Sequence, residues 1–155
     1  MKQALVRAGL VTGALAVALA GALAMTLGSG VAAAQDNVAY VGTGLFGENE
    51  VGKGAGEEAS GDFSAELDIG KGRFCYMLEV DGLDEVTAAH IHEGGKGNNG
   101  PPVLTLQLAG ANGDDICVNV DKELLSMIAR NKARYYVNVH TAAFPEGAIR
   151  GQLSD

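Results

Sequence analysis

Apolar and polar residues alternate in short runs along most of the chain beyond residue 35. In the clearest run the apolar positions are Phe63, Ala65, Leu67 and Ile69, with polar residues between them. A period of two is typical of a β-strand with one face on a core and the other in solvent. The same pattern predicts roughly eight strands, at residues 38–46, 63–69, 73–80, 86–92, 103–108, 116–120, 135–140 and 148–153.

One segment breaks this period. Asp121 is a suitable helix N-cap, and Leu124, Leu125 and Ile128 form an apolar stripe after it, which predicts a helix ending near residue 131. Strands and helices do not otherwise alternate. The pattern therefore predicts an all-β fold, an antiparallel β-sandwich or Greek-key barrel with one short helix.

The N-terminal segment has a different character. Lys2 and Arg7 precede an apolar stretch, and Ala32–Ala34 satisfies a small-residue cleavage pattern just before Gln35. We interpret residues 1–34 as a secretory signal peptide and residues 35–155 as one domain. The alternative is an uncleaved membrane anchor, the only route to a membrane that the sequence offers. The expected location is extracellular, with cell-envelope association left open.

Charge narrows the choice of partners. The chain has a formal net charge of −8. Binding to nucleic acid requires a basic face for the phosphates, so a nucleic-acid partner is not expected. The acidic surface is more simply a device for solubility, with cation binding as the lesser alternative. The expected partner is an extracellular protein or ligand whose identity the sequence does not give.

The cysteines also suit an exported protein. The chain has two, Cys75 and Cys117. In an oxidising compartment an even number of cysteines predicts a disulfide, which here joins this pair. Two unpaired thiols would be the alternative in a reducing compartment.

All three histidines lie in two predicted strands. His90 and His92 alternate in TAAHIHEGG, and His140 ends YYVNVH. Residues two apart on a strand share a face, so His90 and His92 point the same way and Ile91 points into the opposite layer. If the two strands are neighbours, three imidazoles converge.

Converging imidazoles suggest that one copper or zinc ion binds His90, His92 and His140, with water in a fourth position. Around them, Glu93 is a candidate for an oxygen ligand or an orienting hydrogen bond. Asn138 and Arg150 are candidates for outer residues that orient the site.

The alternative is structural: the histidines would hydrogen-bond the adjoining loops to the sheet. No residue pair suited to acid–base catalysis and no serine nucleophile motif is present, so catalysis is not expected. Four acids offer oxygen ligands for calcium but lack the spacing of a known calcium loop: Glu48, Glu50, Glu57 and Glu58.

Three segments resemble the CHRD domain, a module named after chordin. They are LFGENEV (45–51), VDGLDEVTAAHIHEGGKGNNGPPV (80–103) and YYVNVHTAAFPEGAIRGQL (135–153). The resemblance implies an all-β extracellular domain with no established catalytic activity. A secreted binding or structural module is therefore the expected function.

A second resemblance is to copper–zinc superoxide dismutases. Those enzymes also have an alternating histidine pair followed by Glu and glycines, a later histidine, and an arginine near the C-terminus. They require four copper-binding histidines, whereas this chain has three in total. The resemblance thus implies at most a mononuclear copper or zinc site, which is the alternative function.

Overall fold

The computed structural model describes residues 37–109 and 115–155. Its strands are β1 (Val38–Phe46), β2 (Ser60–Asp68), β3 (Arg73–Asp81), β4 (Val86–Glu93), β5 (Pro102–Leu106), β6 (Ile116–Asn119), β7 (Tyr135–Thr141) and β8 (Ile149–Gln152). Its helices are α1 (Lys122–Arg130) and two short 3-10 turns, η1 (Gly47–Asn49) and η2 (Lys132–Arg134). The predicted signal peptide lies outside the described residues. No helix in the described part of the chain has the length and hydropathy needed to span a membrane.

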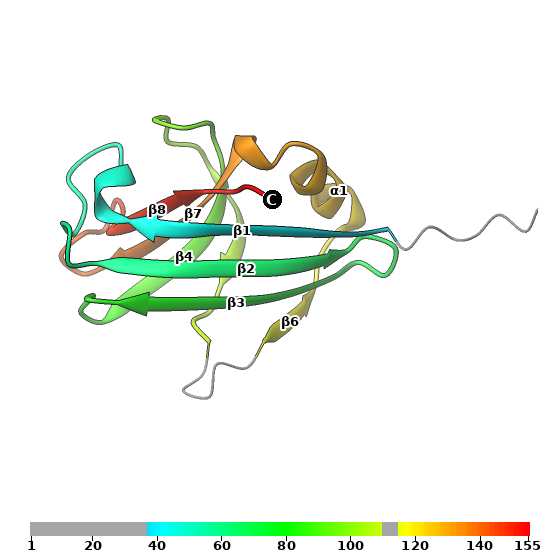
Figure 1. The fold of residues 1–155 in the computed structure, drawn as a ribbon, viewed down its shortest axis with the longest axis horizontal. Coiled ribbons are helices and arrows are strands. Elements are labelled where there is room, and N and C mark those ends of the chain that lie inside the picture. The colour runs from blue at the N-terminus through cyan, green and yellow to red at the C-terminus, as the bar shows by residue number, and fades with distance from the viewer. Residues whose placement is uncertain (1–36, 110–114) are drawn as a thin grey trace, which may run out of the picture. The chain divides into compact units, whose positions relative to one another are not determined.

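The strands form one antiparallel sheet in the order β5-β4-β7-β8-β1-β2-β3-β6. In Figure 1, β1, β2 and β3 lie in front, and β4 and β7 cross behind them. The two halves of the sheet meet where β8 pairs with β1, at Phe46 and Arg150. A further bridge joins Gly42 to Ser154. The predicted all-β antiparallel fold is confirmed, as one sheet that curls on itself.

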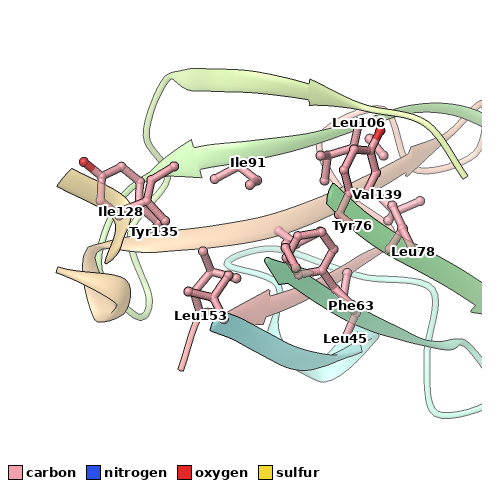
Figure 2. Close-up of a cluster of buried hydrophobic side chains, with 14 of the residues drawn as sticks. Leu45, Phe63, Tyr76, Leu78, Ile91, Leu106, Ile128, Tyr135, Val139 and Leu153 are labelled. Atoms are coloured by element: carbon pink, nitrogen blue, oxygen red, sulfur yellow. The ribbon is translucent and has the colours of Figure 1, made fainter. Parts of the chain in front are cut away.

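The core fills the space between the two halves. Leu45, Phe63 and Leu78 come from β1, β2 and β3, and Ile91 and Val139 face them from β4 and β7 (Figure 2). These residues alternate with polar ones in the sequence, as expected for strands with one buried face. The inner face of the curled sheet is therefore occupied by packed apolar side chains.

The predicted helix is α1, and its N-cap is confirmed. The Asp121 carboxylate accepts hydrogen bonds from the backbone N–H groups of Glu123 and Leu124. These contacts satisfy donors that have no partner within a helix. Leu125 and Ile128 are fully buried in the core, so the apolar stripe attaches the helix to the sheet.

The predicted disulfide is present. Cys75 on β3 and Cys117 on β6 are opposite each other in the register of the two strands and are bonded. The bond lies at the free edge of the sheet and ties the short strand β6 to its neighbour.

Candidate metal centre

Neighbouring strands place all three histidines on one face of the sheet. His90 and His92 lie on β4, and His140 lies on β7, which pairs with β4. Ile91 and Val139, which alternate with them, are fully buried in the core. The histidines therefore project from the outer face of the sheet.

The three imidazoles converge there. Each histidine contributes one ring nitrogen to the group, and the nitrogens of His90, His92 and His140 all lie within 4.8 Å of one another. The ring centroid of His90 lies 5.5 Å from that of His92 and 5.3 Å from that of His140. Within the described ranges this is the one group of three or more metal-ligating side chains, and Glu48, Glu50, Glu57 and Glu58 form no such group.

Two of the rings are fixed by loop carbonyls. His92 Nδ1 lies 2.8 Å from the Gly100 oxygen, and His140 Nδ1 lies 3.0 Å from the Pro145 oxygen. Because a carbonyl oxygen only accepts, each Nδ1 must carry the proton. In the neutral rings Nε2 then presents a lone pair. Those two Nε2 atoms and His90 Nδ1 are buried and have no hydrogen-bond partner in the described structure.

The environment favours the neutral ring. Burial lowers the pKa of His92, and the hydrogen bond to Gly100 opposes this effect only in part. Burial likewise lowers the pKa of His140, against the hydrogen bond to Pro145. A neutral imidazole with a free lone pair is the form that binds a metal.

Tyr136 completes the support of His92. Its ring stacks on the imidazole with the centroids 4.9 Å apart. Its hydroxyl accepts a hydrogen bond from the Gly100 N–H at 3.1 Å, and the carbonyl of Gly100 holds His92 Nδ1. The three residues form a closed ring of contacts that fixes the plane of the His92 imidazole.

Arg150 acts on the site through the same ring of contacts. Its Cζ lies 3.4 Å from the Tyr136 ring centroid. Its guanidinium donates to Asn99 Oδ1 and to the backbone oxygens of Gly95 and Asn98. The arginine makes no hydrogen bond to a histidine in the described structure, so it holds the covering loop in place and does not orient an imidazole directly.

Asn138 makes different contacts from those that its position suggested. Its amide donates to the Glu50 carboxylate and to the Ile149 backbone oxygen at 3.1 Å. Burial raises the pKa of Glu50 to about 7, although the bond from Asn138 and the charge of Arg150 lower it. Asn138 therefore anchors the loop that carries Glu50 to the face of β7 on which His140 lies.

Glu93 is directed elsewhere. Its carboxylate pairs with Arg134 at 3.2 Å, where both side chains are partly exposed. It is not a member of the histidine group. Its position next to His92 in the sequence does not bring it to the site.

The sequence pattern predicts no site role for Tyr136, and for Glu50 it offers only a calcium ligand, not a contact with Asn138. The sequence does contain a signal for Tyr136. It lies two residues before Asn138 and four before His140, so all three share one face of β7. For Glu50 no local signal existed, because its contact with Asn138 joins residues 88 positions apart.

Comparison with known families agrees with this fold. The model of the CHRD domain family matches residues 41–153, which is most of the chain. Neither the curated proteins nor the solved structures give a significant match. The matched range includes all three histidines and every strand except the first residues of β1. The chain therefore belongs to the CHRD domain family, as a small all-β module.

Proposed function

We propose that this chain is a CHRD-domain binding module that holds one copper or zinc ion on His90, His92 and His140. The observation that carries the proposal is the set of three buried ring nitrogens without a hydrogen-bond partner, one from each member of the converging group. Buried polar atoms are nearly always hydrogen-bonded, so three exceptions at one place call for a ligand.

The hydrogen bonds of the outer nitrogens favour a metal as that ligand. Metal-binding histidines commonly donate their second N–H to a backbone carbonyl, which fixes the tautomer and the ring orientation. Gly100 and Pro145 serve His92 and His140 in this way. A tetrahedral ion would bring its nitrogen ligands to about 3.4 Å from one another. The three ring nitrogens already lie within 4.8 Å of one another, so the imidazoles need to move only a short way to bind the ion.

The donor set limits the ion and its chemistry. Imidazole suits copper and zinc, whereas calcium and magnesium require oxygen ligands. Three protein nitrogens leave a fourth position for water or a small molecule. The alternative in which the histidines only attach loops uses the Nδ1 atoms of His92 and His140 but leaves the three buried nitrogens unexplained.

We further propose that the protein works outside the cytoplasm. The predicted signal peptide at residues 1–34 and the Cys75–Cys117 bond support this location, because disulfides persist in oxidising compartments. An extracellular partner, protein or small ligand, is part of the same proposal.

The test is metal analysis of the protein expressed without a histidine tag. After incubation with copper or zinc and removal of free ion, we expect one ion per chain by elemental analysis. His92→Ala should lose the ion, because it removes one of three ligands. Glu93→Gln is the matched control: it changes the next residue, whose side chain pairs with Arg134, and should retain the ion. Sub-stoichiometric metal in the unmutated chain would exclude the proposal.

A further inference from the structure

A second polar site lies beside the C-terminal strand. A cavity of about 220 Å³ is lined by Thr43, Asn49, Lys96, Gly97, Arg150 and Gln152. None of the three histidines lines it. Its lining contains two cations and no acid, in a chain whose net charge is −8. The local charge of this cavity is thus opposite to that of the protein.

Arg150 is the unusual member of this lining. It is only 2% exposed, and no carboxylate of the described residues lies within ion-pairing distance of it. Its three hydrogen bonds go to neutral oxygens of the covering loop. A guanidinium has five N–H groups, so two remain without an acceptor there. Buried charges are normally paired, because removing an ion from water is costly.

Glu50 supplies only part of a counter-charge. It is the carboxyl whose charge acts on Arg150, yet burial raises the pKa of Glu50 to about 7. At neutral pH a substantial fraction of this group is therefore protonated. The hydrogen bond that the Glu50 carboxylate accepts comes from Asn138, which lies opposite Arg150 in the register of β7 and β8.

The neutral side chains of the cavity are already engaged. The Asn49 amide donates to the Arg150 backbone oxygen. The Gln152 amide nitrogen donates to three carbonyls of neighbouring segments, whereas its Oε1 is buried and has no donor among the described residues. Binding would thus rest on the two cations.

We propose that this cavity binds a small oxyanion, such as hydrogenphosphate or the carboxylate of a sugar acid, between Lys96 and Arg150. Lys96 is exposed on the covering loop, where it can close over a ligand held by the buried guanidinium. Charge-assisted bonds from both groups to oxyanion oxygens are the strong hydrogen bonds of such sites. The site uses none of the proposed metal ligands, so it does not depend on the metal proposal.

The test is calorimetric titration of the chelator-treated chain with inorganic phosphate and, separately, with glucuronate, against sodium chloride of equal ionic strength. We expect saturable binding of at least one of them beyond the chloride control. If only one of the two anions binds, it shows whether the site takes a phosphate or a carboxylate. If both bind, the site recognises the negatively charged oxygens that the two anions share.

The deciding variant is Lys96→Glu, an exposed loop position whose change spares the fold. It should weaken binding by about tenfold or more, because a repulsive charge replaces an attractive one beside the ligand. Lys122→Glu is the matched control, since it makes the same charge change at a lysine that bonds Gly70 and lines no part of the cavity. Absence of saturable binding, or equal affinity in the two variants, would overturn the proposal.

Discussion

Glu50 is a carboxyl that the fold places in partly buried surroundings. It accepts a hydrogen bond from Asn138, and its carboxyl group lies against Gly147. A Cβ at Gly147 would meet the Glu50 Oε2 at 2.5 Å, and the φ of that glycine is +146°. The backbone conformation therefore favours glycine at this position, and a side chain there would displace the Glu50 carboxyl. The packing of Glu50 is what raises its pKa to about 7.

This raised pKa gives a pH-dependent stability. Protonation of Glu50 stabilises the fold fully below the ordinary pKa of 4.5, and that contribution is lost as the pH rises through about 7. Glu50→Gln keeps an acceptor for Asn138 but cannot ionise. Between about pH 5 and about pH 8 it should lose less stability than the unmutated chain, by about 1–2 kcal/mol after allowance for solvent screening. Urea denaturation at both pH values measures this difference.

The control is Glu57→Gln, which removes an exposed carboxylate from the same loop. It should not reproduce the change in pH dependence. Parallel pH profiles for the unmutated chain and Glu50→Gln would mean that Glu50 is not buried as described.

Among the elements, β6 depends most on a covalent bond. It has four residues, pairs with β3 alone among the described strands, and is mostly exposed. Short edge strands with little buried surface are weakly held. The Cys75–Cys117 bond closes a segment of 42 residues and attaches this strand to the sheet.

Removal of the bond should therefore loosen β6 first. The double variant Cys75→Ala/Cys117→Ala should lose about 2–4 kcal/mol of stability by the chain-entropy argument. Amide exchange should increase in β6 and change little in β4 and β7, which carry the histidines. Uniform loss of protection across all strands would contradict a local role for the bond.

The strands and the helix are the part of this protein that the sequence predicts best. The period of two predicted β1 with the same bounds that the structure has, because one face of that strand is buried and the other is not. The same pattern predicts that β2 begins at Phe63, whereas the strand begins at Ser60. The residues before Phe63 include Gly61, a small buried residue whose Cβ would collide with the Glu79 backbone oxygen, and such a position carries no apolar signal.

At the scale of the whole molecule, loops from three places in the chain are anchored to the face of the sheet that carries the histidines. The segment after β4 is held by His92, Tyr136 and Arg150. The loop after β7 is held by His140, and the loop after β1 is held by Asn138 through Glu50. Each residue that holds a loop is one of the histidines or lies next to one. Fixing the histidines in place should therefore also fix the loops.

Metal binding should therefore protect these loops. Zinc at about 100 times its dissociation constant should stabilise the fold by about 2.7 kcal/mol. Amide exchange should slow in residues 94–101 and 142–147, whose carbonyls hold the imidazoles. His140→Ala should abolish both effects. Stabilisation by zinc that persists in this variant would place the ion elsewhere.

The sequence by itself determined the strand pattern, the helix cap, the cysteine pair and the family, since these rest on periodicity, on local hydrogen bonding and on motifs. It also placed His90 and His92 on one face of a strand. Only the tertiary structure decided that β4 and β7 are neighbours, which brings His140 to that pair. It also decided that Glu93 turns to Arg134 and that Glu50 reaches Asn138. Strand order and loop closure depend on contacts between distant residues, and no local pattern records them.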